Sequence, residues 1–401
     1  MHPLSLSAWA AAFFVSATLF AHTVAFRLLM LACCAGLALV AIARERGAIR
    51  ALPPIWPALA LWTAWALLSL SWSMDPERTA KELRNEVGYT ALAFWACYVA
   101  GQAHHAVRVV APVVGAAAVL LCGLAFYYFP HGNQWNPPPW PGGPGNLSST
   151  LLTLMPCALL GAWYGQRARD RLVSLASLAL VVLLFAAAYT TLNRTIWVGF
   201  AAQFLLIGAL LASRKVRPMP LRAKVVGTAL ATLIVASAAL ATFQIQMARQ
   251  QAIPAAALDR DSRISLWPQV LEHVKERPLT GYGFGRGMLR SSLLKEFDDT
   301  FLWHAHNLFL DTVVQVGLPG LVLLLFLLGA TVREGWRLAR ASDRFAAACG
   351  FALLCVVAGM VMRNMTDTLW VRQNALLYWG VLGLLLAWGH TARTSASRRS
   401  T

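Results

Sequence analysis

Residues 303–328 read WHAHNLFLDTVVQVGLPGLVLLLFLL, and this stretch predicts a helix that begins at a membrane surface. His304, His306 and Asn307 come first, and an apolar run long enough to cross a bilayer follows at once. A single histidine at such a border is more often an interfacial residue than a catalyst. Two histidines beside Asn307 favour chemistry, because imidazole exchanges a proton near neutral pH.

The composition indicates a membrane protein. The 401-residue chain is 58% hydrophobic and 13% charged, whereas a soluble domain carries about 25% charged residues. The start of the chain, Met1 to Ala25, has no basic segment ahead of its apolar run, so we expect it to be retained as the first span. All seven cysteines lie inside apolar runs, which argues against a disulfide framework and a zinc site.

The apolar stretches predict about twelve spans, each of about 20 residues. They lie near residues 7–25, 27–43, 54–72, 87–101, 108–129, 148–164, 172–189, 194–212, 225–243, 306–331, 345–363 and 374–389. Lys, Arg, Asp and Glu divide unevenly between the two sets of loops, with net charges of +15 and +2. We expect the more basic side to be cytoplasmic and to hold both termini. The net charge of +17 is then a topology signal, and nucleic acid is not needed to explain it.

We therefore predict an all-α polytopic membrane protein of about twelve transmembrane helices. A long, mostly helical outer segment separates helices nine and ten. The chain divides into residues 1–243 with helices one to nine, residues 244–305 with the outer segment, and residues 306–401 with helices ten to twelve and a cytoplasmic tail.

The outer segment carries a predicted helix and a glycine-rich break. Apolar residues recur at helical spacing from Arg263 to Val274, and Pro268 indicates a helix start or a kink. Gly281–Gly285 then breaks the helix. This run resembles a nucleotide-binding motif only superficially, because no strand precedes it.

Positive charge is expected to gather at the outer ends of the even-numbered helices. These helices run inward, so their N-termini, the positive ends of the helix dipoles, face the outer water. Candidate caps are Asn146 or Ser148 for helix six, Asn193 for helix eight, and His306 or Asn307 for helix ten. Arg194 adds a charge at helix eight and Arg263 adds one in the outer segment. Together these features favour an anion site.

Each charged candidate also has an ordinary structural explanation. Arg194 can extend to lipid phosphates, and Arg263 can pair with a nearby aspartate. Lys81 and Arg84, in the first outer loop, are more often surface residues than ligands. Asp367 can pair with other loop charges as readily as it meets a substrate.

The sequence lacks the motifs that several kinds of chemistry require. The chain has no carboxylate cluster suited to a divalent metal and no nucleophile elbow, so we expect no metal site. The spans hold almost no charge at mid-membrane depth, Asp311 being the deepest, and this disfavours an ion-coupled transporter.

Five short pieces occur in order along the second half of the chain: Asn193-Arg194, Ser262–Trp267, Pro278–Gly283, His306–Leu310 and Val316–Gly320. Pro144-Gly145-Asn146 and Ser71-Trp72-Ser73 fit more loosely. In this order and topology the chain resembles the O-antigen ligase and polymerase superfamily of bacterial cell envelopes. One departure is Asn193, where the family usually has serine.

The resemblance implies an inverting, metal-independent glycosyltransferase of GT-C-like type, acting in lipopolysaccharide biosynthesis at the periplasmic face of the bacterial inner membrane. The donor would be O-antigen on undecaprenyl diphosphate, and the acceptor a sugar hydroxyl of lipid A–core oligosaccharide. No cofactor is expected, because the glycosyl–diphosphate bond carries the energy.

The resemblance also implies roles for individual residues. His306 would be the general base, and Arg194 and Arg263 would bind the diphosphate. Secondary candidates are Lys81, Arg84, His304, Asn307 and Asp367. We expect His304 to matter less than His306, since residues two apart do not face the same way on a helix.

Three alternatives remain open. A polysaccharide polymerase would use the same donor with a second lipid-linked glycan as acceptor. A protein O-oligosaccharyltransferase would glycosylate a polypeptide, and such enzymes usually carry a longer soluble tail. A non-enzymatic lipid-glycan transporter is disfavoured by the sparse mid-membrane charge and by the gathering of polar elements on one face.

Overall fold

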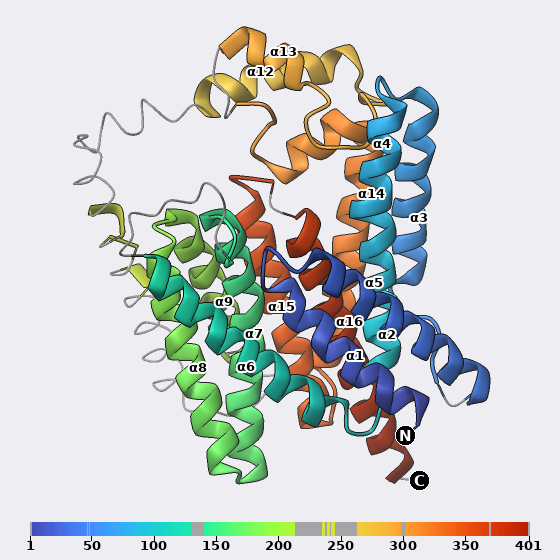
Figure 1. The fold of residues 1–401 in the computed structure, drawn as a ribbon, viewed down its shortest axis with the longest axis vertical. Helices are drawn as coiled ribbons and strands as arrows, with labels where there is room; N and C mark the ends of the chain where they lie inside the picture. Colours follow the sequence, from blue (N-terminus) through green and yellow to red (C-terminus); the bar gives the residue numbers. More distant parts are fainter. Residues whose placement is uncertain are drawn as a thin grey trace.

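The computed structural model describes residues 2–45, 47, 49–129, 140–212, 235–236, 239–240, 242–244, 263–297, 302–368 and 370–399, and within them every regular element is a helix (Figure 1). The α-helices are α1 (Pro3–Thr18), α2 (Val24–Arg44), α3 (Trp56–Leu68), α4 (Pro76–Glu82), α5 (Tyr89–Ala100), α6 (Ala106–Tyr128), α7 (Pro144–Ala168), α8 (Arg171–Thr190), α9 (Arg194–Ala212), α12 (Arg263–Glu276), α13 (Arg290–Phe297), α14 (Leu308–Ala339), α15 (Arg344–Asn364) and α16 (Arg372–Arg399). A 3₁₀ turn, η1 (Ser69–Trp72), precedes α4, and a π-helical turn, η2 (Leu83–Gly88), follows it. The prediction of an all-α chain is confirmed for the described residues.

Seven of the described helices are long and apolar enough to cross a membrane: α2, α6, α7, α8, α14, α15 and α16. Pro3–Thr18 and Arg194–Leu210 form shorter apolar helices. The chain is therefore a multi-pass membrane protein. The predicted spans at 54–72 and 87–101 contain α3 and α5, whereas the predicted ninth span, 225–243, falls mostly outside the described residues. The total of twelve stays a prediction.

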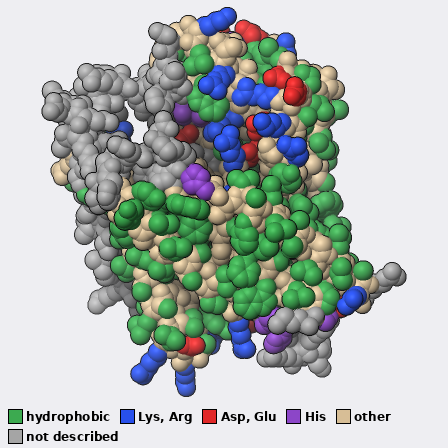
Figure 2. Space-filling model, in the orientation of Figure 1, with side chains coloured by type: hydrophobic (Ala, Val, Ile, Leu, Met, Phe, Trp, Pro, Cys, Tyr) green, Lys and Arg blue, Asp and Glu red, His purple; other side chains and the backbone are tan. Residues whose placement is uncertain are grey.

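Charged side chains lie at both ends of the helix bundle, and hydrophobic ones lie between them. Figure 1 places α12 and α13 above one end and both chain termini at the opposite end. In Figure 2, hydrophobic side chains cover the sides of the bundle, whereas Lys, Arg, Asp and Glu crowd the end beneath α12 and α13. An apolar belt with polar ends suits a bundle that crosses a bilayer.

The helix α16 lies deep in the bundle, and small residues let its neighbours pack closely against it. A Cβ atom at Gly383 would lie 2.4 Å from the carbonyl oxygen of Phe94 in α5, so glycine alone fits at this contact. Leu382 and Leu385 beside it are fully buried. The packing of α16 on α5 fixes the positions of Arg372, which begins α16, and of η2, which leads into α5.

The helix α14 is broken at Val316-Gly317. Gly317 has a φ of +73°, and a Cβ atom there would lie 2.2 Å from the Leu279 carbonyl oxygen. The break leaves backbone groups without helical partners, and Trp65 of α3 donates its indole N–H to one of them, the Val316 carbonyl, at 2.9 Å. At the break, α14 therefore contacts both α3 and the outer segment.

The glycine-rich segment Pro278–Gly285 runs along this break. The Leu318 N–H donates to the Pro278 carbonyl at 2.8 Å, and the Gly283 N–H donates to the Gln315 carbonyl at 2.9 Å. Two sequence pieces that are far apart in the chain, Pro278–Gly283 and Val316–Gly320, therefore form one unit. The observed role of the glycines is close backbone packing on α14.

The outer helices have a small hydrophobic core of their own, which is formed by Leu266, Val270, Tyr282, Leu289, Leu293, Leu302, Ala305 and Val314. The helix predicted from Arg263 to Val274 is confirmed as α12, with Pro268 inside it. Trp267 donates its indole N–H to the Ala305 carbonyl at 2.9 Å. This bond ties α12 to the connection that carries both histidines.

Candidate active site

The two histidines lie in a short connection just before α14. Asn307 caps this helix, because its Oδ1 accepts the N–H groups of Phe309 and Leu310 at 3.0 and 3.1 Å. Its Nδ2 donates to the Met365 carbonyl at 2.9 Å. His306 precedes the cap with a φ of +48°, a left-handed conformation that few residues with a Cβ adopt. The cap and this turn hold the imidazole of His306 outside the helix, next to the α15–α16 loop.

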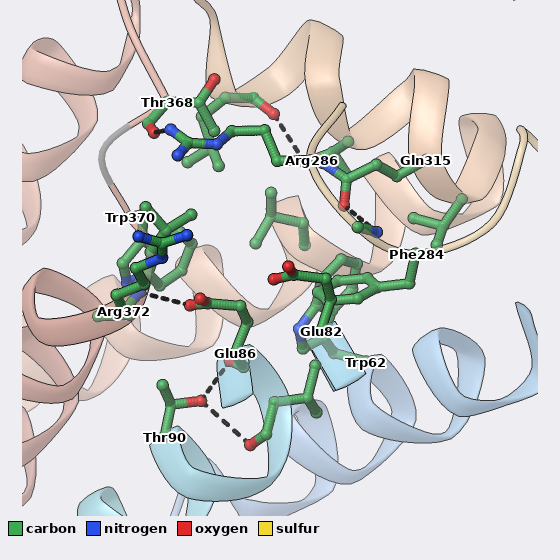
Figure 3. Close-up of a pocket in the computed structure, with 18 of the residues that line it drawn as sticks. Trp62, Glu82, Glu86, Thr90, Phe284, Arg286, Gln315, Thr368, Trp370 and Arg372 are labelled. Carbon is green, nitrogen blue, oxygen red and sulfur yellow. Dashed lines mark hydrogen bonds between the residues drawn. The ribbon is translucent and has the colours of Figure 1, made fainter. Parts of the chain in front are cut away.

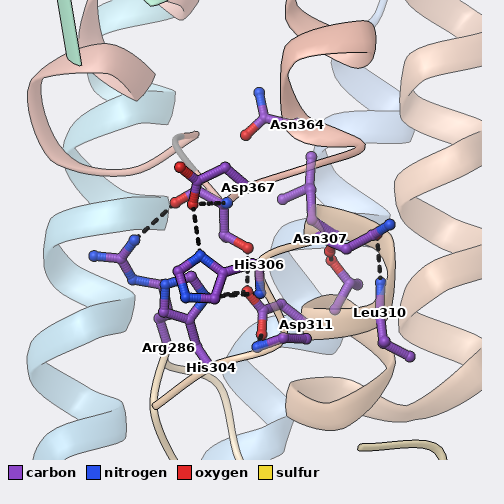
Figure 4. A network of polar contacts seen from close by, with 12 residues as sticks. Arg286, His304, His306, Asn307, Leu310, Asp311, Asn364 and Asp367 are labelled. Atoms are coloured by element: carbon purple, nitrogen blue, oxygen red, sulfur yellow. Dashed lines mark hydrogen bonds and ion pairs between the residues drawn. The ribbon is translucent and has the colours of Figure 1, made fainter. Parts of the chain in front are cut away.

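Asp367, in the α15–α16 loop, is the partner of His306 (Figure 4). Its Oδ1 lies 3.3 Å from His306 Nδ1, and its Oδ2 lies 3.6 Å from Nη2 of the buried Arg363. Burial raises the pKa of Asp367, but the bonds from His306 and Arg363 outweigh it, so the pKa lies well below its usual range. An ionised Asp367 favours the proton on Nδ1 of His306 and leaves Nε2 as the nitrogen that can accept one.

His304 is deeply buried against His306, with ring centroids 3.8 Å apart. Its Nδ1 accepts the backbone N–H of His306 at 3.0 Å. Burial lowers the pKa of His304, which favours the neutral form of this ring. The expectation that the two rings face different ways was wrong, because both residues lie in a turn ahead of α14, where helical spacing does not apply.

Asp311, in the first turn of α14, anchors the same connection. Its Oδ1 accepts the Ala305 N–H at 2.9 Å, and its Oδ2 accepts the hydroxyl of Thr368 and lies 3.3 Å from Nδ1 of His304. The carboxylate is almost fully buried. The deepest acidic residue of the predicted spans thus fixes the site at the outer end of α14.

His304, His306 and Asp367 also form a set that could hold a metal ion. One ligand atom from each lies within 4.8 Å of the others. Two imidazoles and a carboxylate are ligands that Zn²⁺ and related ions accept. A search of the sequence for carboxylate clusters misses this set, because its members come from two distant parts of the chain. Chelation therefore tests the expectation that the site needs no metal.

Arg286 connects the histidine site to a cavity of about 340 Å³ (Figure 3). Its Nη1 donates to the Thr368 carbonyl at 2.7 Å, and its guanidinium carbon lies 4.8 Å from the centre of the Trp303 ring. The charged residues that line the cavity are Arg78, Glu82, Glu86, Arg286, Arg290 and Arg372. Its aromatic lining is Trp62, Phe284, Trp303, Trp370 and Trp379. Such a mixture of rings and charged groups suits a sugar that carries an anionic group.

Glu86 faces this cavity from η2, just ahead of the predicted span 87–101. Burial raises its pKa to about 7, although the Arg372 N–H, which donates to its Oε2 at 2.6 Å, acts in the opposite direction. Repulsion from Glu82 adds to the increase. A carboxyl group that titrates near neutral pH can accept or donate a hydrogen bond to a ligand hydroxyl.

Arg194 and Arg263 are the predicted diphosphate ligands. Each is the first residue of a helix, Arg194 of α9 and Arg263 of α12. Arg194 is exposed, with its guanidinium carbon 5.4 Å from the centre of the Phe243 ring, and it does not line the cavity. Asn193 caps α9 as predicted, accepting the Thr195 N–H at 3.0 Å. The side chain of Arg263 lies outside the described residues, so the predicted pairing of the two arginines stays a prediction.

The first outer loop contributes different residues from the ones that the sequence suggested. Lys81 and Arg84 are exposed and do not line the cavity. Arg78, Glu82 and Glu86 do, because their spacing of four places them on one face of the helical run. This stripe was visible in the sequence.

Arg286 and Arg290 were also missed in the sequence. They follow the glycine-rich segment, and the packing of that segment on α14 determines where they point. No local pattern in a single sequence reports that packing.

Comparison with known families gives this geometry a context. The O-antigen ligase family model matches residues 179–325, a region that holds Arg194, Arg263, Arg286 and both histidines. Asp367 lies beyond the matched region. No curated protein is similar enough to this chain to count as a match. The chain is therefore similar to the O-antigen ligase family over this region, which includes the histidine connection ahead of α14.

Proposed function

We propose that this protein is an O-antigen ligase. It transfers O-antigen glycan from undecaprenyl diphosphate to a sugar hydroxyl of lipid A–core oligosaccharide, with inversion at the anomeric carbon and without a metal. The observation that carries the proposal is the His306–Asp367 pair beside an arginine-lined cavity, in a chain whose residues 179–325 match the O-antigen ligase family model.

His306 acts as the general base. The acceptor hydroxyl gives its proton to Nε2 while its oxygen attacks the anomeric carbon of the donor. The bond between that carbon and the diphosphate oxygen breaks, and undecaprenyl diphosphate leaves. Asp367 stabilises the imidazolium that forms, and the imidazolium then returns the proton to the leaving diphosphate or to water.

Arg194 and Arg263 hold the diphosphate and stabilise the charge that develops on it. Their positions at the outer ends of α9 and α12, within the matched region, support this role. Lys81 and Arg84 remain secondary candidates. Asn307 contributes through its cap of α14, and His304 through its contact with the His306 ring.

We place the site in the periplasm and both termini in the cytoplasm of a bacterium, with the helices in the inner membrane. The net charges of +15 and +2 on the two sets of loops support this orientation. The arrangement in Figure 1, with both termini at the end away from α12 and α13, agrees with it.

A polymerase of the same superfamily is the second candidate, because it would use the same base and donor. The two enzymes differ in their acceptor. A protein O-oligosaccharyltransferase would accept a polypeptide, and a transporter would form no product at all. Reconstitution with defined acceptors separates all four.

The test uses purified protein in proteoliposomes with lipid-linked O-antigen and no nucleotide. Product on lipid A–core is expected, and His306→Ala should lower kcat by roughly a hundred- to ten-thousandfold. His273→Ala, at a histidine of α12 outside the site, is the matched control and should retain activity. Product formed only on a second lipid-linked glycan would show a polymerase. Absence of product with every acceptor would refute an enzymatic role.

A further inference from the structure

The cavity beside the histidine site carries more positive charge than the chain itself neutralises. Arg78, Arg286, Arg290 and Arg372 line it, against Glu82 and Glu86. Among the described residues, none of these four guanidinium groups has a carboxylate within 4.0 Å. Arg78 and Arg286 are half-buried, whereas Arg290 and Arg372 are exposed, so a bound anion would pair with guanidinium groups that the ligand can reach.

Two of these arginines are held in place before any ligand arrives. The guanidinium carbons of Arg286 and Arg290 lie 4.8 and 5.6 Å from the centre of the same Trp303 ring. Arg78 donates from Nη2 to the Arg286 carbonyl at 3.0 Å. Arg78 of α4 and Arg286 and Arg290 of the outer segment therefore line the same part of the cavity, and guanidinium groups are suited to bind phosphate oxygens.

The part of the cavity that lies toward the membrane-crossing helices is lined mainly by apolar residues, together with Thr90, Thr312 and Gln315. Leu59 and Trp62 come from α3, Leu324 from α14, and Ala375 and Trp379 from α16. A cavity with a cationic outer wall and a mainly apolar inner wall suits the anionic head of a lipid. Its volume of about 340 Å³ is at the low end for ligand sites, enough for one substituted sugar and not for a whole oligosaccharide.

The cationic wall also reaches the proposed base. Arg286 Nη1 donates to the Thr368 carbonyl at 2.7 Å, and the Thr368 N–H donates to Asp367 Oδ1 at 2.8 Å. Asp367 in turn pairs with His306. A phosphate bound at Arg286 would therefore hold its sugar next to the base.

We propose that this cavity binds a phosphate-bearing sugar of the acceptor glycolipid and positions a neighbouring sugar hydroxyl at His306. The assignment to the acceptor rests on the proposed ligase function. The donor lipid also carries phosphate. In that alternative, the cavity would bind the diphosphate of the donor and not a phosphate of the acceptor. The two sources differ in which lipid the arginines recognise.

Binding is measured first, without turnover, by native mass spectrometry of the full chain in nanodiscs. The probes are lipid A–core glycolipid, the same glycolipid with its phosphates removed, and undecaprenyl diphosphate. The variant is Arg290→Gln. The matched control is Arg277→Gln, which removes an arginine that lies 5.0 Å from the Tyr282 ring in the same outer segment but does not line the cavity.

Arg290→Gln should weaken binding of the phosphorylated glycolipid about tenfold or more, since it removes a charge-assisted bond. It should leave binding of the dephosphorylated glycolipid and of undecaprenyl diphosphate unchanged, and Arg277→Gln should match the wild type. Equal loss for both forms of the glycolipid, or loss confined to undecaprenyl diphosphate, would overturn the proposal. Phosphate-dependent binding without any transfer would support the cavity assignment and count against the ligase function alone.

Discussion

Asp367→Asn is the sharpest test of the general-base mechanism. The substitution keeps the size of the side chain and removes its charge, so the His306 ring loses the carboxylate 3.3 Å from its Nδ1. A hydrogen bond to a charged group contributes about 1.5–3 kcal/mol, which corresponds to a roughly ten- to 150-fold decrease in kcat. The KM for the donor should change little, because Asp367 contacts His306, Arg363 and Thr368 and does not line the cavity.

The assay is transfer by the reconstituted protein under saturating donor. Glu334→Gln is the matched control, since Glu334 and His390 form another buried carboxylate–imidazole pair, 2.9 Å apart, at the opposite end of α14. This control should retain wild-type kcat. Wild-type kcat in Asp367→Asn would refute the role of the pair, and an equal loss in Glu334→Gln would show a general effect on folding.

The same substitution should also change how the stability of the protein depends on pH in acid. The pKa of Asp367 is depressed in the folded protein, so its contribution to stability is fully present above its unfolded pKa of ~3.9 and is lost as pH falls further. The Tm of the wild type in detergent should therefore fall more steeply below pH ~4 than the Tm of Asp367→Asn. An equal decrease of Tm with falling pH in the wild type and in Asp367→Asn would contradict this prediction.

Three further predictions concern the cavity, the break in α14 and the metal question. The folded pKa of Glu86 is about 7, above the usual value of 4.5, so the wild type loses stability as pH rises between these values. Glu86→Gln removes that loss, and its Tm advantage over the wild type should grow from pH 5 to pH 8; a constant difference would contradict the shift. Gly317→Ala should destabilise the protein by about 2 kcal/mol or more, because the new Cβ would meet the Leu279 carbonyl. Gly329→Ala in the same helix meets nothing within 4 Å and should be neutral or stabilising in thermal unfolding; equal effects would argue against the break as a strained contact. Dialysis against EDTA should leave transfer unchanged, and loss that Zn²⁺ restores would assign the His304–His306–Asp367 set to a metal.

Most helices could be predicted from the sequence because the bilayer imposes their length and composition. Apolar runs gave α2, α6, α8 and α15 within a few residues, and charge in the loops gave an orientation that the placement of the termini agrees with. The cap of α14 was also predictable, since the amide of Asn307 needs only two nearby N–H groups to act.

The convergence of side chains from separate elements could not be predicted. Pairing of His306 with Asp367 depends on how the α15–α16 loop folds over α14, and a single sequence does not encode that distance locally. The positions of Arg286 and Arg290 in the cavity likewise depend on the packing of Pro278–Gly285 against the break at Gly317. Tertiary packing therefore placed Arg286 and Arg290 at the cavity, whereas the stripe of Arg78, Glu82 and Glu86 follows from spacing alone.

The docking of Pro278–Gly285 on the break of α14 also has a mechanical consequence. Trp65 and Trp72 hold the two segments from the side of α3 and η1, through bonds of 2.9 Å to the Val316 carbonyl and 2.8 Å to the Thr280 carbonyl. The start of α14 is also bonded to the α15–α16 loop, through Asn307 to the Met365 carbonyl and through Asp311 to the Thr368 hydroxyl. The loop that holds Asp367 and the connection that holds His306 are thus braced against each other from both sides. A substitution at Trp65 or Trp72, far from the histidines along the chain, should therefore disturb the distance between His306 and Asp367.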